Sequence, residues 1–264
     1  MLSQQYRPVK RITRKDRKIG CYEFVYDILD STMTKAKELA EKNFPDGTVV
    51  VAKEQTQGKG RNGRIWMSPR GGLWLSIIFR PKIEISCMFI FSYMISLSVA
   101  ETLQKLGLNP KIKWPNDVLV EGKKNAGILI DTKSTDTEVE YIIAGIGINV
   151  NNKIPRLPGN SIEGTSIKEH VGRKVDIEQV KRYLYDSLEK NYSTVCKSKE
   201  DYIEIFKKWD NFNFLKGRTV KIYDDMSSNP IQGKVIGVNY NTGGLIVKVD
   251  SKMIEVFDSV TIRT

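Results

Sequence analysis

A segment rich in glycine and basic residues, at positions 54–64, constrains the fold of this chain more than any other feature. Its sequence, EQTQGKGRNGR, places Lys59, Arg61 and Arg64 among three glycines. Glycine lets the backbone approach a ligand closely, and lysine and arginine bind phosphate and carboxylate groups. The segment therefore predicts a loop that holds anions.

The same segment matches the dinucleotide-binding pattern G-x-G-x-x-G through Gly58, Gly60 and Gly63. That pattern requires a strand before it and a helix that opens directly after it. A strand is expected at residues 48–53, but residues 65–72 read IWMSPRGG, where proline and paired glycines prevent a helix from starting. The segment thus does not fit a doubly wound dinucleotide-binding fold, and a solvated glycine-rich hairpin loop remains the alternative.

Hydrophobic periodicity predicts an α+β fold. Strands are expected at residues 22–28, 48–53, 72–79, 111–114, 118–120, 125–131 and 138–150. Helices are expected at residues 34–42, 86–106, 176–197 and 201–209. This order predicts a mixed, mostly antiparallel sheet with helices on one face.

Length and composition divide the 264 residues into three parts. Residues 1–20 are rich in lysine and arginine and predict a basic, mobile N-terminal arm. Residues 21–212 would form the main domain. Short strands and turns then follow, so residues 213–264 predict a small separate β-barrel.

The formal net charge of +11 favours anionic partners, and a basic nucleic-acid-binding protein is one function class that it suggests. Three widely spaced cysteines and a single histidine argue for a reducing compartment and against a disulfide scaffold or zinc site. The longest uncharged run, residues 85–100, is shorter than the roughly 20 residues of a membrane span. We therefore expect a buried helix there, no membrane association and a cytoplasmic protein.

A second cluster, KIKWPNDVLV, begins at residue 111. Pro115 fixes its own φ and restricts the residue before it, which holds the Asn116 amide and the Asp117 carboxylate beside Lys113. A carboxylate next to a lysine on a rigid corner suits a Mg²⁺–phosphate site or a hydrogen-bonding clamp. An ordinary Pro-Asn-Asp turn is the alternative.

Two further strands carry small residues at unusual positions. The segment KKNAGILI places Gly127 three residues after Lys124, so that this lysine could reach an anion in an open groove. The segment GIGIN places Gly145 and Gly147 inside an apolar strand that ends at Asn149. Such glycines favour close approach of a ligand to the backbone, although a solvated turn and a β-bulge are the alternatives.

In their order along the chain, these motifs resemble the biotin protein ligase family from about residue 22 to the C-terminus. The matching segments are Ser31-Thr32, Gln55, GKGRNGR, KWPND, KNAGIL, GIGINV and Thr165-Ser166. The resemblance implies a two-step enzyme: biotin and MgATP give biotinyl-5′-AMP and pyrophosphate, and the adenylate then acylates a lysine of a biotin carboxyl carrier protein. It also implies a class II synthetase-like catalytic domain over 21–212, an SH3-like β-barrel over 213–264, and allows a homodimer.

The resemblance implies a role for individual side chains. The biotin site would comprise Ser31, Thr32, Met33, Gln55, Lys59, Gly60, Arg61, Lys124 and Gly127. The ATP site would comprise Arg61, Arg64, Trp66, Lys113, Asn116, Asp117, Asn149 and Ser166. Lys124, Arg61 and Asp117 would be catalytic, with Asp117 also the candidate Mg²⁺ ligand. Trp74 and Ile128 would supply apolar walls.

Three departures from the family pattern stand out. Lys59 replaces the usual arginine and loses its bidentate fork, and Met33 replaces an asparagine of the biotin pocket. Only about twenty residues precede the first strand, too few for a helix-turn-helix, so no operator DNA is expected as a partner.

Three other functions compete with this interpretation. Lipoate or octanoate ligases and transferases on the same fold generally carry an Arg-Arg-x-x-Gly-Gly-Gly loop and a downstream His-Asp pair, which this sequence lacks. A nucleic-acid-binding protein would not explain KWPND. A non-catalytic biotin-binding protein would not require Asp117 and Lys124.

Overall fold

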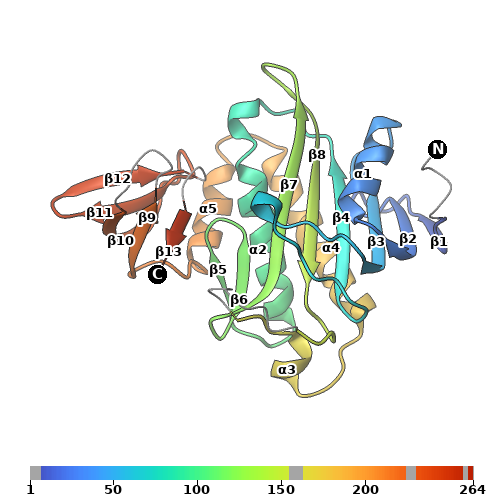
Figure 1. Cartoon of the computed structure of the whole chain (residues 1–264). Coiled ribbons are helices and arrows are strands. Elements are labelled where there is room, and N and C mark those ends of the chain that lie inside the picture. Colours follow the sequence, from blue (N-terminus) through green and yellow to red (C-terminus); the bar gives the residue numbers. More distant parts are fainter. Residues whose placement is uncertain (1–6, 155–162, 224–229, 258–260, 264) are drawn as a thin grey trace.

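A large twisted sheet forms the centre of the molecule. The computed structural model describes residues 7–154, 163–223, 230–257 and 261–263. Eight strands follow the order β1-β2-β3-β4-β8-β7-β6-β5, and all neighbours pair antiparallel except the parallel pair β2 and β3 (Figure 1). The strands are β1 Lys10–Thr13, β2 Tyr22–Leu29, β3 Val49–Gln55, β4 Leu73–Phe79, β5 Pro110–Lys113, β6 Asp117–Val120, β7 Lys123–Ser134 and β8 Val139–Ile148. The predicted mixed, mostly antiparallel sheet is confirmed.

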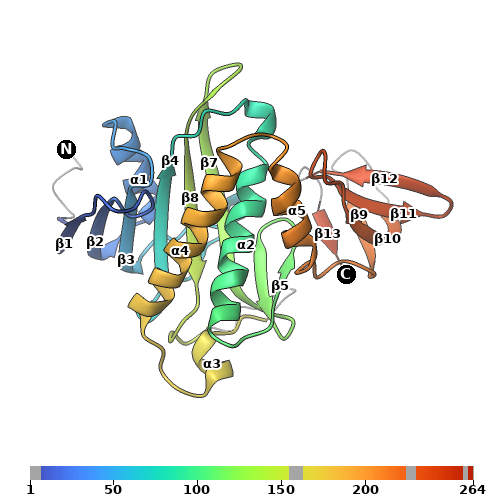
Figure 2. The same ribbon diagram turned by 180° about the vertical axis from the view of Figure 1, so that it is seen from behind.

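Three helices cover one face of this sheet (Figure 2): α2 (Ile90–Lys105), α4 (Ile177–Val195) and α5 (Tyr202–Asp210). Helix α2 packs against α4 and α5 as well as against the sheet, and it is buried on nearly all sides. The segment Ile85–Lys105 is long and apolar enough to cross a membrane, but most of it is buried inside the fold. It is a core helix, as predicted.

Helix α1 (Thr32–Glu41) packs on the opposite face, so helices do not all lie on one face as the sequence had suggested. Its Ala36 and Leu39 side chains join Val50 of β3 in a second core cluster, whereas Val51 of β3 belongs to the core under α2. Successive strand residues point to opposite faces, and because β3 is apolar on both faces it can bury both.

The described part of the N-terminal stretch is built into the fold, which corrects the expectation of a mobile arm for residues 7–20; residues 1–6 lie outside the described ranges. Strand β1 pairs with β2 and adds an edge strand to the sheet. The Ile19 backbone N–H donates to Glu189 of α4 at 2.7 Å, and Arg17 forms an ion pair with Asp186 at 3.3 Å. Backbone and side-chain contacts with α4 thus order this basic segment, although its composition alone predicts that it is solvated.

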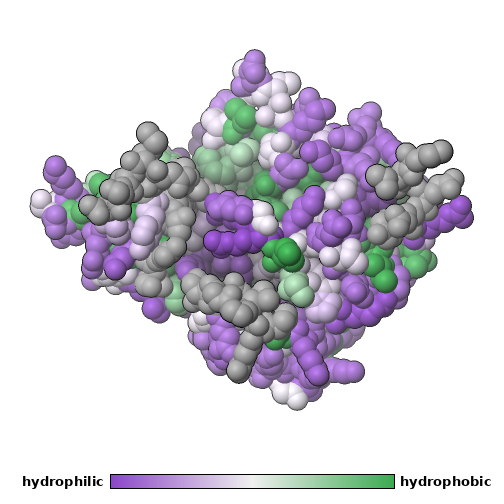
Figure 3. Space-filling model, viewed as in Figure 1, coloured by the Kyte–Doolittle hydropathy of each residue, from purple (hydrophilic) through white to green (hydrophobic). Residues whose placement is uncertain are grey.

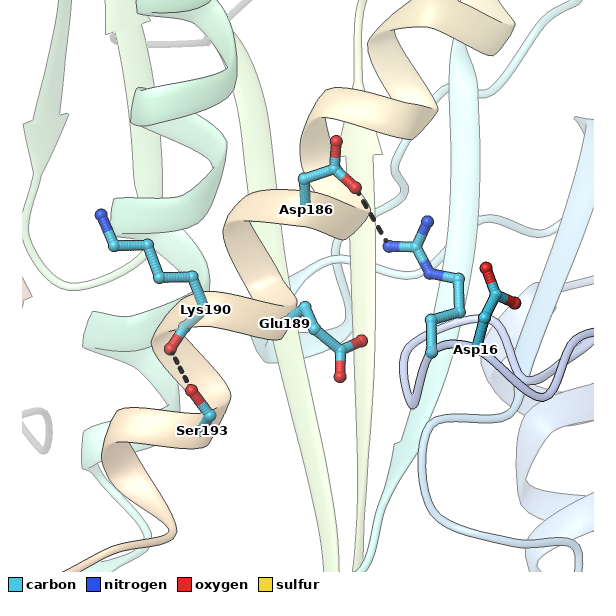
Figure 4. Close-up of a pocket in the computed structure, with 6 residues that line it drawn as sticks. Asp16, Asp186, Glu189, Lys190 and Ser193 are labelled. Carbon is cyan, nitrogen blue, oxygen red and sulfur yellow. Dashed lines mark hydrogen bonds and ion pairs between the residues drawn. The ribbon is translucent and has the colours of Figure 1, made fainter.

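A groove of about 480 Å³ runs between this segment and α4. Figure 4 shows Asp16 on one side and Asp186, Glu189 and Lys190 along the helix on the other. The groove lies on the helix-covered face.

A second sheet follows α5. Its five strands are all antiparallel, in the order β12-β11-β10-β9-β13. They are β9 Thr219–Tyr223, β10 Ile231–Val238, β11 Leu245–Val249, β12 Lys252–Val256 and β13 Thr261–Arg263. Its buried residues, Val235 and Val247 among them, belong to the same core cluster as α2 and α5. The core is therefore continuous across residue 213, and the division into two domains there stays a prediction.

Candidate active site

Glycines on two neighbouring strands form a floor on the sheet face opposite α2. Gly127 of β7 is paired directly with Gly147 of β8. A Cβ atom at Gly147 would lie 2.4 Å from Nε1 of Trp66, and one at Gly127 would lie 2.9 Å from the Trp66 ring. Only glycine lets the Trp66 indole rest on this floor, which explains two of the unusual glycines in the sequence.

The glycine-rich segment folds back on itself as a hairpin that crosses in front of β7 and β8 (Figure 1). Gln55 N–H donates to the Ser68 carbonyl at 3.0 Å, and Trp66 N–H donates to the Gly58 carbonyl at 2.9 Å. A short 3₁₀ turn (Arg61–Gly63) forms its tip, with Gly63 at φ 71°. The hairpin alternative noted in the sequence is thus correct for the shape of the loop, and its base packs on the glycine floor.

Lysines and a carboxylate meet beside Trp66. The Lys124 ammonium lies 2.7 Å from the Asp117 carboxylate and 5.1 Å from the centre of the Trp66 ring. Burial lowers the pKa of Lys113, and Lys124 lowers it further, while Asp117 acts in the opposite direction. Two lysines next to a single carboxylate leave excess positive charge, which suits a polyanionic ligand.

The Trp-Pro-Asn-Asp corner is held rigidly against β7. The Trp114–Pro115 peptide is cis. The Asn116 amide donates to the Ile128 carbonyl at 2.8 Å, and the Ile128 N–H donates to the Asn116 carbonyl at 3.0 Å. Arg61, from the hairpin tip, reaches the Asn116 side-chain oxygen at 3.5 Å. The hairpin and the corner, 55 residues apart in sequence, therefore meet in one site.

A neutral polar network lies at the start of α1. Ser31 caps the helix, and its hydroxyl accepts from the Met33 N–H at 3.3 Å. The Gln55 side-chain oxygen accepts from the Thr32 N–H at 2.8 Å and from the Thr32 hydroxyl at 3.0 Å. Ser31 and Thr32 are buried, so these uncharged groups are suited to a buried neutral ligand.

Ser68 and Ser76 complete this network, and the sequence analysis missed both. Ser76 contacts the Thr32 hydroxyl at 2.8 Å, and Ser68 accepts from the Gln55 side-chain nitrogen at 2.8 Å. Ser76 lies two residues after Trp74 in an otherwise apolar strand, so both share the face opposite α2. A serine in an otherwise apolar strand is a feature of the sequence by which Ser76 could have been identified.

The remaining predicted biotin-site residues occupy different positions. Met33 is nearly buried, and a Cβ atom at Gly145 would lie 2.7 Å from its sulfur. Gly60 donates its N–H to Arg64 within the hairpin. Lys59 and Arg64 are exposed on this loop, so the structure does not bring them into the Lys124 cluster.

Three residues have structural contacts that compete with their predicted roles. Asn149 accepts from the Asn152 amide at 3.0 Å, and Ser166 begins helix α3 (Ile167–Val171) with its N–H directed to Glu169. Ile128 belongs to the core under α2, because its neighbour Gly127 faces the site. Ile128 is therefore not a wall of the site; Trp74, packed edge-to-face on Trp66, is on the correct face.

Within the described ranges, no group of three or more His, Cys, Asp or Glu side chains is arranged to hold a metal ion. Asp117 offers one carboxylate, and Lys124 already contacts it. Mg²⁺ needs six oxygen ligands and commonly takes most of them from water and phosphates. These residues fit a Mg²⁺ ion only if the ion arrives with a nucleotide.

Figure 3 views this face of the molecule. Hydrophilic side chains surround a small apolar patch near its centre. Ile65 and Met67, which flank Trp66 in the hairpin, are exposed to solvent. The hairpin thus presents apolar side chains outward while Trp66 points inward, the arrangement of a cover over a binding site.

Known proteins similar to this chain include biotin ligases. The profile of the biotin/lipoate A/B protein ligase family matches residues 25–149. The bifunctional ligase/repressor BirA of Bacillus subtilis is 37% identical over 185 residues, which are 69% of this chain and 57% of that protein. The biotin–[acetyl-CoA-carboxylase] ligase of Paracoccus denitrificans is 35% identical over 125 residues, 46% of this chain and 51% of that one. This chain spans only about half to three fifths of these relatives' length.

A solved structure extends the similarity to nearly the whole fold. The biotin protein ligase of Aquifex aeolicus, in complex with biotin and ATP, superposes with a TM-score of 0.77 and 28% identity. The superposition covers 91% of this chain and 98% of that one. The family profile falls on the strands and loops that build the site, and we conclude that residues 25–149 of this chain are a domain of the biotin/lipoate A/B protein ligase family.

Proposed function

We propose that this protein is a biotin protein ligase, which forms biotinyl-5′-AMP from biotin and ATP and transfers the biotin to a lysine of a carrier protein. One observation carries the proposal: a cationic cluster around Lys124 lies next to a neutral polar network around Thr32, across a floor of glycines. A substrate with a charged end and a neutral, hydrogen-bonding end fits such a site. Biotin has a carboxylate at one end and an uncharged ureido ring at the other.

The neutral network would bind the ureido ring. A urea group offers two N–H donors and one carbonyl acceptor, which the Ser31 and Thr32 hydroxyls and the Gln55 amide can match. A charged residue here would be costly to bury without a partner. Met33, Gly60 and Gly127 would shape the pocket around the ring and its side chain. Lys59 would approach only if the hairpin moves.

The cationic cluster would carry out adenylation. A biotin carboxylate oxygen attacks the α-phosphorus of ATP, a new carboxylate–phosphate bond forms, and the bond to pyrophosphate breaks. Arg61 and Lys124 would offset the repulsion between the carboxylate and the phosphates, a stabilisation that grows as charge shifts toward the leaving group. Lys113, Asn116 and Asp117 would position the triphosphate, with Arg64, Asn149 and Ser166 on the nucleotide side.

In the second step the neutral amine of the acceptor lysine attacks the biotinyl carbonyl carbon and gives up a proton to water, the amide bond forms, and AMP leaves with the electrons of the broken bond between the carbonyl carbon and the phosphate oxygen. Lys124 would hold the carbonyl oxygen or the phosphate during this step. Mg²⁺ would neutralise the phosphates when bound, with Asp117 as the protein carboxylate that reaches it. The acceptor would be a biotin carboxyl carrier protein in the cytoplasm, and the ligase would be able to form a homodimer.

Trp66 connects the hairpin to this chemistry. Its indole nitrogen is buried and has no hydrogen-bond partner among the residues that the structure describes. A buried N–H that lacks an acceptor is unfavourable, so a ligand that supplies one, or that displaces the ring to stack against adenine, would be favoured. The intrinsic fluorescence of Trp66 should therefore change when biotin and ATP bind.

The test is exchange of labelled pyrophosphate into ATP, measured with biotin and, in parallel, with lipoate. Exchange that requires biotin supports the proposal, and exchange only with lipoate would assign the sister activity of the family. Exchange with neither would contradict adenylation.

Two neighbouring lysines provide a matched pair of variants for the same assay. Lys124 is part of the cluster, whereas Lys123 forms an exposed ion pair with Glu163. Lys124→Ala should lower the exchange rate by about a hundredfold or more with the fold intact, as expected for loss of a cation that stabilises the transition state. Lys123→Ala should leave it within about twofold. Equal effects would remove Lys124 from the site.

A further inference from the structure

One buried hydroxyl group joins the site to the C-terminal sheet. The Tyr93 hydroxyl, on α2, accepts from the Trp114 indole nitrogen at 2.8 Å and donates to the Gly243 carbonyl. Trp114 opens the Trp-Pro-Asn-Asp corner, and Gly243 lies in the turn between β10 and β11. An indole N–H can only donate and a carbonyl can only accept, so the single hydroxyl proton must point to Gly243. The direction of the chain of hydrogen bonds is therefore fixed.

Two aromatic side chains of α5 hold the Tyr93 ring in place. Its centre lies 4.9 Å from that of Phe206 and 4.9 Å from that of Trp209, both edge-to-face and both on α5. Trp209 in turn donates to the Ser96 hydroxyl on α2 at 2.9 Å. Tyr93 and Trp114 are almost fully buried, so water cannot replace a lost hydrogen bond at either residue.

The turn at the other end is equally constrained. Gly243 has a φ of 75°, and a Cβ atom there would lie 2.6 Å from the Phe89 ring. Asp210, at the end of α5, accepts from Lys216 and from the Tyr240 hydroxyl at 3.4 Å, which fixes the sheet on the helix. A rigid helix pair thus stands between the turn and the corner.

We propose that Tyr93 is a positioning residue: through Trp114 it holds Asn116 and Asp117 in register with β7, and it makes this register depend on the docked C-terminal sheet. A second contact supports the same path, since the Ser92 hydroxyl donates to the Pro115 carbonyl at 3.0 Å. Both hydrogen bonds of this path are made by the Tyr93 hydroxyl, so loss of that hydroxyl removes both at once. The effect on catalysis, but not the structural coupling itself, rests on the proposed ligase function.

Hydrogen exchange tests the structural coupling without any activity. The Ile128 N–H donates to the Asn116 carbonyl and therefore reports on the corner. In Tyr93→Phe this amide should exchange with solvent about tenfold faster, because the loss of two buried hydrogen bonds loosens the corner. Tyr192→Phe is the matched control: it removes another buried hydroxyl, which lies on α4 and is bonded to Asp46 at 3.0 Å rather than to the corner. Unchanged protection of Ile128 in Tyr93→Phe, or equal loosening in Tyr192→Phe, would overturn the proposal.

Kinetics test the consequence for the site. Tyr93→Phe should raise the KM for ATP about fivefold to tenfold and leave the KM for biotin within about twofold, since the corner belongs to the nucleotide side. Gly243→Ala, made from the other end, should give the same split, and the double variant should be no worse than either single one. Additive losses, or equal rises in both KM values, would contradict a shared path. Absence of biotin-dependent exchange in the unmodified protein would refute the ligase proposal and leave the hydrogen-exchange result to decide this one.

Discussion

At the scale of single residues, burial makes the charge of Lys113 sensitive to the binding of a polyanion. Its pKa lies below the ordinary value of 10.5, because burial and Lys124 disfavour the ammonium more than Asp117 favours it. The pH window of interest runs from the lowered pKa of Lys113 in the folded protein to its ordinary pKa in the unfolded chain. In this window the folded free protein binds fewer protons than the unfolded chain, so the stability of the fold rises with pH. A triphosphate beside Lys113 would favour the ammonium and raise the pKa again.

The protein should therefore take up protons when ATP binds at an alkaline pH below 10.5. Calorimetry in two buffers of different ionisation enthalpy measures this uptake. Lys113→Gln should abolish it, whereas Lys111→Gln, an exposed position in the same strand, should leave it unchanged. Uptake that survives in Lys113→Gln would place the responsible group elsewhere.

At the scale of elements, a buried ion pair joins the edge of the sheet to α4. Glu23 of β2 is fully buried, and its carboxylate accepts from Lys181 at 2.8 Å and from the Tyr185 hydroxyl at 2.7 Å. Arg14, which follows β1, lies 3.9 Å from the same carboxylate. The helix, the edge strands and the N-terminal segment therefore depend on one buried negative charge being compensated.

Lys181→Met should lower the free energy of unfolding by about 3 kcal/mol, because it leaves the Glu23 carboxylate without its closest cation. The exposed third member of the group provides the comparison: Glu178→Gln removes only a surface partner of Lys181 and should cost less than about 0.5 kcal/mol. Urea unfolding followed by circular dichroism separates the two. Similar small losses would mean that Tyr185 and Arg14 compensate the charge unaided.

At the scale of the whole molecule, the two sheets share one hydrophobic core, so we expect them to unfold together. Val235 of β10 is fully buried in that core, while Ile236 beside it is 40% exposed. Val235→Ala should lower the stability of the entire chain by about 2 kcal/mol, and Ile236→Ala by about 0.5 kcal/mol.

The four tryptophans, all between residues 66 and 209, report on the first sheet and its helices, whereas circular dichroism reports on both sheets. Coincident transitions by the two signals in Val235→Ala are the expected result. A tryptophan transition that does not shift while part of the dichroism melts earlier would instead establish an independent second domain.

Local patterns in the sequence were sufficient to predict most strands, the core helix and several residues that the structure brings together in the candidate site. Alternating apolar residues identified the central strands, and an uncharged run identified α2, because these signals depend only on near neighbours in sequence. The glycines and lysines of the two motifs were informative for the same reason: each has a backbone or charge property that few structural roles require.

Tertiary structure decided which of these residues meet. It placed Ile128 in the core and Gly127 in the site, since one step along a strand reverses the face. It fixed the N-terminal segment through Glu189 and recruited Ser76 to the network around Thr32. It also joined Trp114 to Gly243 through Tyr93. Such contacts connect positions far apart in the chain, and they are specified by packing of complete elements, which no local pattern encodes.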